Sequence, residues 1–172
     1  MRLFVAIDLS EDVRTRIAAF RDALKARSSR GKFARQENIH LTVAFIGECD
    51  AERTDKIKDA MDSLQFGKFP MTVDRIGRFR RDGGDIWWLG ISESEELQSM
   101  RRDLVKALAN SGTGVDERYD PHITIGREVR TDERPHSIDG FTATVDSVDL
   151  MRSERIDGTL TYTSIHTKRA WP

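Results

Sequence analysis

The sequence contains the same short pattern twice, and this duplication constrains the fold more than any other feature. A His-x-Thr motif lies in an apolar, strand-like segment at residues 39–43 (I-H-L-T-V) and again at residues 121–125 (P-H-I-T-I). An earlier apolar segment precedes each motif, at residues 3–7 (L-F-V-A-I) and 87–91 (W-W-L-G-I), with helical periodicity in between. The chain therefore repeats a strand, a helix and a motif-bearing strand.

A further pair of related strands extends the repeat. F-P-M-T-V-D begins at Phe69, after the first motif, and F-T-A-T-V-D begins at Phe141, after the second. Each half is then a β-α-β-β unit. Two such units predict an α+β fold with pseudo-two-fold symmetry, in which mainly antiparallel sheets face a central groove and the helices lie outside.

The expected helices begin at three capping residues. Ser10, Asp50 and Ser94 each precede a helical pattern, the first helix fades near residues 28–31, and Gly112 ends the third. The expected strands cover residues 3–7, 40–46, 69–76, 86–91, 122–126, 141–151 and 160–167.

Composition limits the class of protein. The formal net charge is -1, so the chain does not coat long nucleic acid through bulk charge, and a nucleic-acid substrate would be held locally, at a terminus. Cys49 is the single cysteine, which makes no intramolecular disulfide and favours a reducing compartment. No stretch approaches the ~20 apolar residues of a membrane helix. We expect a cytoplasmic protein without membrane contact, and a monomer.

The two motifs carry the residues suited to catalysis. Side chains alternate along a strand, so His40 and Thr42 share one face, as do His122 and Thr124. The residues expected on the opposite, packed faces are Leu41, Val43, Phe45, Ile123 and Ile125. Histidine can act as acid or base near neutral pH, and threonine hydroxyls can donate hydrogen bonds to phosphate oxygens. The repeat therefore predicts two imidazoles and two hydroxyls around one site.

Other candidates are weaker. Arg127 offers a planar cation suited to phosphate, but simple alternation turns it away from His122 unless the strand bends near Gly126. Phe4 and Trp88 could stack on a nucleobase or belong to the core. Three more arginines, Arg78, Arg80 and Arg81, could touch an RNA backbone, although a solvated loop is the simpler interpretation. His136 and His166 have no paired motif and are expected to be structural or at the surface.

The quoted segments resemble the 2H phosphoesterase superfamily, in particular its RNA 2′,3′-cyclic phosphodiesterases, also named 2′-5′ RNA ligases. The similarity includes R-L-F-V-A-I-D-L, N-I-H-L-T-V-A-F-I-G-E, W-W-L-G, P-H-I-T-I-G-R and S-x(8)-Y from Ser153 to Tyr162. The resemblance implies a single domain, residues 1–172, of two intertwined lobes. It also implies a phosphate contact for Arg127, and it implies that His40 protonates the leaving oxygen while His122 activates water.

The sequence thus predicts a cofactor-free, metal-independent enzyme that opens the 2′,3′-cyclic phosphate of RNA ends or small cyclic nucleotides to a 2′-phosphate. Joining or cleaving 2′-5′ linkages in RNA is an alternative at the same site. A non-catalytic RNA-end binding protein is a second alternative, and intact histidines in both motifs argue against it. A metallohydrolase is a third, disfavoured because no Asp or Glu clusters beside the motifs.

Overall fold

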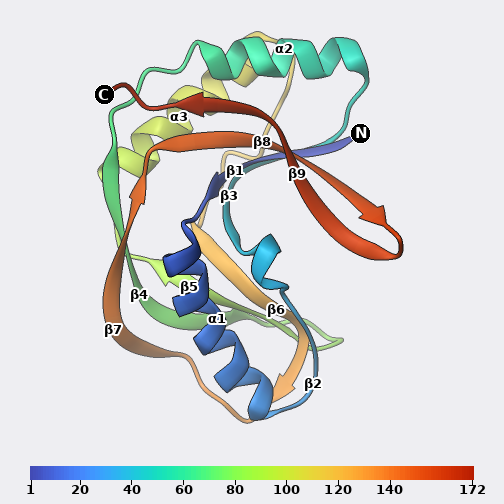
Figure 1. Ribbon diagram of the computed structural model, residues 1–172, viewed down its shortest axis with the longest axis vertical. Coiled ribbons are helices and arrows are strands. Elements are labelled where there is room, and N and C mark those ends of the chain that lie inside the picture. The colour runs from blue at the N-terminus through green and yellow to red at the C-terminus, as the bar shows by residue number, and fades with distance from the viewer.

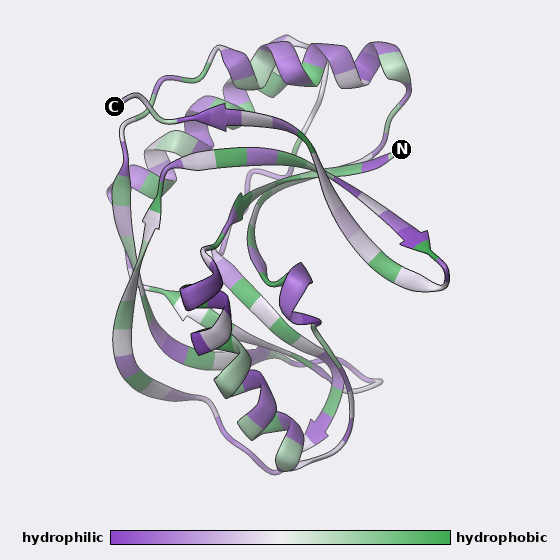
Figure 2. Ribbon diagram, viewed as in Figure 1, coloured by the Kyte–Doolittle hydropathy of each residue, from purple (hydrophilic) through white to green (hydrophobic).

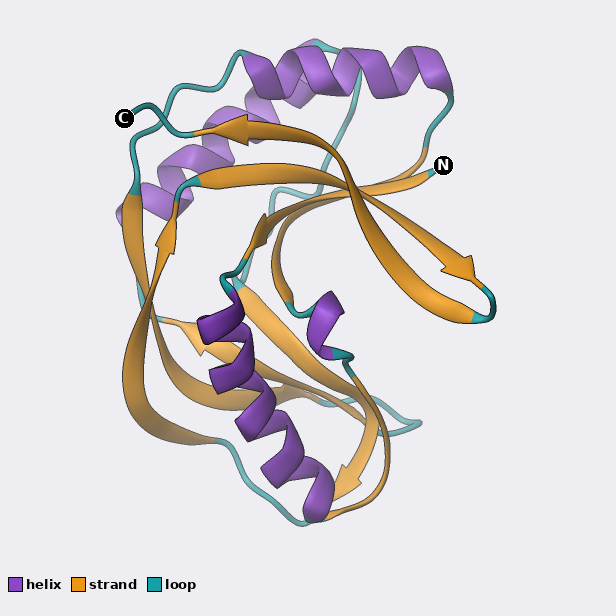
Figure 3. Ribbon diagram, viewed as in Figure 1, coloured by secondary structure: helices purple, strands orange, loops and turns teal.

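The computed structural model describes all 172 residues and has nine strands and three α-helices (Figure 1, Figure 3). The strands are β1 (Arg2–Asp8), β2 (Ser28–Phe33), β3 (His40–Glu48), β4 (Phe69–Phe79), β5 (Asp85–Ile91), β6 (His122–Thr131), β7 (His136–Val145), β8 (Ser147–Ile156) and β9 (Thr159–Arg169). The helices are α1 (Glu11–Ala26), α2 (Ala51–Asp62) and α3 (Glu95–Asn110), with a short 3-10 turn, η1 (Gln36–Asn38).

The strands form two antiparallel sheets. The four-stranded sheet has the order β3-β1-β8-β9 and the five-stranded sheet the order β2-β6-β5-β4-β7. Each sheet contains one motif strand beside the first strand of its own repeat, β3 beside β1 and β6 beside β5. The predicted α+β fold class and antiparallel sheets are confirmed.

The two repeats exchange strands and helices. β4 follows the first motif but pairs with β5 of the second repeat, and β8 follows the second motif but pairs with β1 of the first. The helices cross over as well: α1 packs on β2 and β6, whereas α3 packs on β3 and α2 on β9. Figure 1 shows α1 beside the lower sheet and α2 and α3 beside the upper one. Neither α1 nor α3 packs on the sheet that contains the motif strand of its own repeat.

The expected strand over residues 141–151 is two strands, and that prediction was wrong. β7 ends at Val145 in the five-stranded sheet, and the chain passes Asp146 before β8 starts in the other sheet. The equivalent residue of the first repeat, Asp74, lies at an irregularity of β4. The two related sequences therefore share a backbone disturbance at the same aspartate.

The helix starts were predicted correctly. The side chains of Ser10, Asp50 and Ser94 accept hydrogen bonds from the backbone N–H three residues ahead, which satisfies one free donor of each first turn. Hydrophobic and hydrophilic residues alternate along the helices and strands (Figure 2), and the apolar ones fill one continuous core cluster that spans both sheets. No helix is long and apolar enough to cross a membrane.

β2 was not predicted. Its sequence, S-S-R-G-K-F, lacks apolar alternation, and its residues are exposed or partly exposed. It forms the edge of the five-stranded sheet against β6, where α1 covers it. An edge strand of this kind needs only backbone pairing on one side, so hydrophobic periodicity does not reveal it.

Candidate active site

Both motif strands contain the same β-bulge. In β3, Ala6 lies opposite Thr42 and Val5 opposite Ala44, so Val43 is an extra residue. In β6, Trp88 lies opposite Thr124 and Trp87 opposite Gly126, so Ile125 is extra in the same way. A bulge of this type reverses the alternation of the side chains beyond it. The duplication therefore includes the irregularity as well as the strands.

The bulge turns the residue five positions after each motif histidine toward the histidine face. In β3 this residue is Phe45, which is 68% exposed, so its predicted place in the packed face was wrong. In β6 it is Arg127, which is also exposed. The alternation of side chains thus shifts by one residue next to Gly126, which puts Arg127 on the same face of β6 as His122. Arg127 makes no side-chain hydrogen bond or ion pair, which leaves its guanidinium free.

Matching residues 3–7 with residues 87–91, as the sequence repeat does, aligns Phe4 with Trp88, and the strand register corrects this alignment. Asp8 faces His40 and Gly90 faces His122, so Trp88 corresponds to Ala6 rather than to Phe4. The aromatic residues near the two histidines are therefore not copies of each other.

His40 is held firmly from both ring nitrogens. Its Nδ1 lies 2.6 Å from the carbonyl oxygen of Asn38, which can only accept, so Nδ1 carries a proton. Its Nε2 lies 2.8 Å from Thr42 Oγ1. The rings of Phe4 and Tyr162 pack against the imidazole, with centroids 5.0 and 5.2 Å away. In the neutral form, Nε2 is the nitrogen that can exchange a proton with a ligand.

Burial lowers the pKa of His40 below its usual value, because the enclosed site keeps out the water that would stabilise the charged imidazole. The hydrogen bond to Asn38 and the carboxylate of Asp8 oppose this shift, whereas the charges of Arg127 and Arg14 add to it. A phosphate anion placed at the site would favour the protonated imidazole and raise the pKa again.

His122 sits in a more open setting. Its Nδ1 lies 2.7 Å from the carbonyl oxygen of Asp120, which fixes the same tautomer as in His40, and its Nε2 has no hydrogen-bond partner. Phe79 packs edge-on against the ring at 5.0 Å, and Trp88 lies 6.2 Å away. Thr124, two residues on, has a free hydroxyl. The Nε2 lone pair is available to a water molecule or a substrate hydroxyl.

Contacts between the sheets bring the two motif strands together. β3 and β6 belong to different sheets but lie against each other. Tyr119, just before His122, donates a hydrogen bond of 2.9 Å to the carbonyl oxygen of Thr42. Burial raises the pKa of Tyr119, so its hydroxyl stays protonated and keeps this bond at neutral pH. The positive charge of Arg127 on β6 helps to lower the pKa of His40 on β3.

The aromatic candidates differ in access. Phe4 is buried, with 5% of its surface exposed, and packs on His40 and Tyr162. Trp88 is partly exposed and lies over Gly77, where a Cβ atom would overlap its ring. Phe45 is exposed beside Phe4, with ring centroids 6.4 Å apart. Trp88 and Phe45 therefore present more ring surface to a ligand than Phe4 does.

Three neighbours of the site were missed or only partly indicated by the sequence. Ser153 and Tyr162, the ends of the S-x(8)-Y pattern, are cross-strand partners in β8 and β9, which places Tyr162 on His40. The sequence pattern did not place Phe79 near the site, because this residue lies at the edge of a polar link. Phe45 was assigned to the wrong face because simple alternation does not account for the bulge at Val43.

The other histidines lie elsewhere. Nε2 of His166 is 2.7 Å from Asp62 on α2, and His136 is exposed on β7 with Nδ1 bonded to a neighbouring carbonyl. The structure contains no group of three or more His, Cys, Asp or Glu side chains placed to hold a metal ion. No donor set for a metal therefore accompanies the two motifs.

Comparisons with known proteins find a matching family model and similar sequences. Residues 9–157 match the family model of the 2′-5′ RNA ligase superfamily. The chain is 32% identical over 130 residues to an RNA 2′,3′-cyclic phosphodiesterase of Thermotoga maritima, covering 74% of this chain and 70% of the relative. It is 32% identical over 129 residues to the protein of that name in Escherichia coli K12, covering 74% and 72%.

Solved structures share the fold. E. coli LigT complexed with 3′-AMP superposes with a TM-score of 0.85 at 26% identity, covering 98% of this chain and 97% of LigT. The TT0787 protein of Thermus thermophilus gives a TM-score of 0.84 at 23% identity, with 98% and 97% covered. These proteins thus share the two-sheet fold described above.

Proposed function

Because the chain belongs to the 2′-5′ RNA ligase superfamily, we propose that it hydrolyses the terminal 2′,3′-cyclic phosphate of RNA to a 2′-phosphate, with His40 and His122 as acid and base. The observation that carries the proposal is the tautomer shared by the two histidines. Each Nδ1 proton is held by a carbonyl two residues earlier, so each Nε2 is the reactive nitrogen. The names of the relatives support the same substrate class.

In this mechanism, water attacks phosphorus and the P–O3′ bond breaks. Nε2 of His122 takes the proton from water, and protonated Nε2 of His40 gives its proton to the departing 3′ oxygen. The proton gained by His122 and the proton lost by His40 balance, and solvent exchange restores both. The substrate oxygen replaces Thr42 Oγ1 as the partner of Nε2 on His40.

The remaining groups bind the phosphate and the base. The hydroxyls of Thr42 and Thr124 donate to non-bridging oxygens, and the unpaired guanidinium of Arg127 stabilises the charge that develops there. Trp88 and Phe45 provide surfaces on which a nucleobase can stack, and Phe4 supports His40 from behind. No metal ion takes part, and the protein acts within a single domain in the cytoplasm.

The direct test is product analysis on a short RNA that ends in a 2′,3′-cyclic phosphate, with EDTA present. We expect a 2′-phosphate end and no 3′-phosphate. Loss of turnover with EDTA and recovery with zinc or manganese would favour the metallohydrolase instead. Binding without turnover would favour the RNA-end binding protein, and a joined product from two RNAs would favour ligation.

A further inference from the structure

An arginine-rich surface adjoins the site and has no role in the chemistry above. A cavity of about 720 Å³ lies between the β4–β5 link, the second half of β6 and the end of α1, and a second of about 610 Å³ shares part of its wall. The arginines that line these cavities are called here the arginine cluster: Arg27, Arg78, Arg80, Arg81, Arg130 and Arg134.

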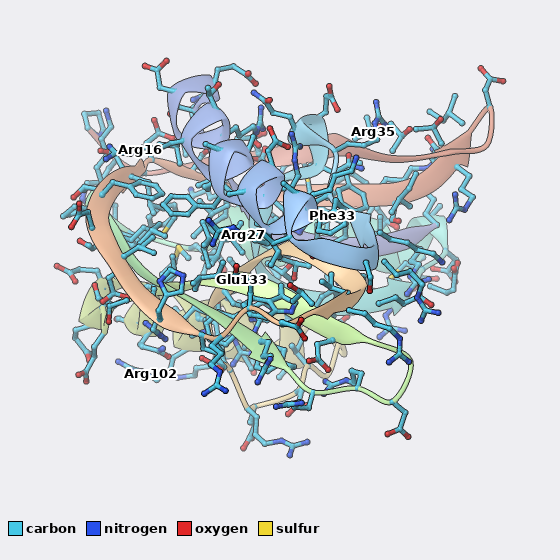
Figure 4. All side chains as sticks on the ribbon, turned by 90° about the horizontal axis from the view of Figure 1, so that it is seen from below. Arg16, Arg27, Phe33, Arg35, Arg102 and Glu133 are labelled. Carbon is cyan, nitrogen blue, oxygen red and sulfur yellow. The ribbon has the colours of Figure 1, made fainter.

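Most of these arginines have no carboxylate partner. Arg27 pairs with Glu133 at 2.8 Å (Figure 4 labels both), and Arg78 approaches Asp85 at 3.9 Å. The arginines left without an ion pair are Arg80, Arg81, Arg130 and Arg134, against the unpaired carboxylates of Asp82 and Asp132. A chain of net charge -1 thus concentrates positive charge at this surface. Such a surface favours a ligand with several negative charges.

The β4–β5 link, which carries Arg80 and Arg81, is tied to neighbouring strands. Arg130 donates to the carbonyl oxygen of Asp82 at 3.4 Å, and Arg30 on β2 donates to that of Gly83 at 2.5 Å. Gly84 has a φ of +117° and packs so closely on β6 that a Cβ atom would lie 2.5 Å from the Glu128 backbone. The backbone that carries Arg80 and Arg81 is therefore held in place, so binding a ligand through them costs less conformational entropy than binding through a mobile loop.

The arginine cluster continues from the second histidine. The guanidinium of Arg81 lies over the ring of Phe79, 5.8 Å from its centroid, and the same ring packs on His122 at 5.0 Å. β6 carries His122, then Arg127, then Arg130. At about 3.3 Å per residue, the strand leads from His122 to Arg130 over roughly 25 Å, a distance longer than one nucleotide.

We propose that the arginine cluster binds backbone phosphates of the RNA chain upstream of its cyclic-phosphate end, so that an oligonucleotide is a better substrate than a cyclic mononucleotide. The inference rests on the function proposed above and adds a binding surface for the upstream part of the RNA chain. Arginine suits this task because its planar fork binds phosphate oxygens in pairs.

The test compares a 2′,3′-cyclic mononucleotide with a ten-nucleotide RNA that ends in the same cyclic phosphate. The variant is Arg80→Gln with Arg134→Gln, since neither side chain has an ion pair or contacts the histidines. A control variant, Arg2→Gln with Arg102→Gln, removes the same charge from exposed positions outside both cavities. Figure 4 labels Arg102, which lies on α3.

We expect the native protein to show a higher kcat/KM for the ten-nucleotide RNA than for the mononucleotide. In the double cluster variant, kcat/KM for the ten-nucleotide RNA should fall about tenfold, and kcat/KM for the mononucleotide should not change. The slope of the logarithm of the binding constant against the logarithm of the salt concentration should become shallower by about two. The control variant should match the native protein on both substrates.

Binding separates failure of this inference from failure of the proposed function. The affinity for a ten-nucleotide RNA ending in a 2′-phosphate is measured by fluorescence anisotropy. Equal affinity in the native and cluster-variant proteins, or equal kcat/KM of the native protein for both lengths, would overturn the inference. Absence of turnover together with weakened RNA binding in the cluster variant would instead overturn the hydrolase and keep the RNA surface.

Discussion

At the residue scale, the two motif histidines are alike in tautomer and unlike in environment. His40 is enclosed by Phe4 and Tyr162 and bonded to Thr42, whereas Nε2 of His122 is free. Sequence alone predicted the pair, because period-two alternation places a histidine and a threonine on one face of each strand. It could not predict this difference, which arises because Phe4 of β1 and Tyr162 of β9 pack on His40.

The lowered pKa of His40 leads to a pH prediction. As general acid, His40 must be protonated, so kcat/KM, which reports the free enzyme, should fall as pH rises through its lowered pKa. The bound phosphate anion raises that pKa, so the alkaline limb of kcat should lie at higher pH than that of kcat/KM. The measurement is a pair of pH–rate profiles on a cyclic mononucleotide. Superimposable limbs in the two profiles would show that bound phosphate does not change the pKa of His40.

Arg127 gives the second prediction at this scale. Arg127→Ala should lower kcat by about 10²-fold, because a charged donor to the developing phosphate charge is lost. The melting temperature should not change, since the side chain has no partner in the protein. Arg127→Lys should recover only part of the rate, as it keeps the charge and loses the planar fork. Arg2→Ala serves as the exposed control, and native kinetics in folded Arg127→Ala would remove the residue from the site.

At the scale of single elements, the repeated bulge decides which side chains lie on the same face as the motif histidines. It could not be predicted from alternation, since an extra residue leaves the apolar pattern unchanged until the strand is paired. Its trace in the sequence is the small residue after the bulged one, Ala44 in β3 and Gly126 in β6. The irregularity at Asp146 was hidden in the same way.

The exposed ring of Phe45 tests the consequence of the bulge in β3. Phe45→Leu should raise KM for a cyclic mononucleotide more than it lowers kcat, because stacking with the base is lost while the histidines remain. Trp171→Leu, which removes another exposed ring, should change neither constant. Unchanged KM in folded Phe45→Leu would show that this ring does not contact substrate.

The contact between β4 and β5 gives a stability prediction. Gly77→Ala should lower the free energy of unfolding by about 1–3 kcal/mol, because its Cβ collides with the Trp88 ring. Gly83→Ala, with open space around it, is the control. In a Trp88→Leu background the cost of Gly77→Ala should shrink, measured by urea unfolding. An undiminished cost would place its cause in the backbone.

At the scale of the whole molecule, the exchange of strands and helices joins the two repeats. β4 completes the sheet of the second repeat, β8 completes that of the first, and α1 and α3 cover the sheets of the opposite repeats. The sequence repeat predicted two similar units, but local patterns do not specify which unit a third strand joins.

In the proposed mechanism, one histidine from each repeat serves one reaction. Each single change, His40→Ala or His122→Ala, should lower kcat about 10²–10⁴-fold. The double change should cost less than the product of the two, because both act in one concerted step.

The most direct measurement uses these variants on an activated aryl phosphodiester beside the cyclic-phosphate RNA, with EDTA present. A good leaving group needs little protonation, so His40→Ala should recover much of its rate on the aryl substrate and His122→Ala should not. Recovery by His122→Ala alone would reverse the two roles. Recovery in neither variant would contradict acid–base catalysis by the pair, and would leave the histidines as phosphate-binding groups.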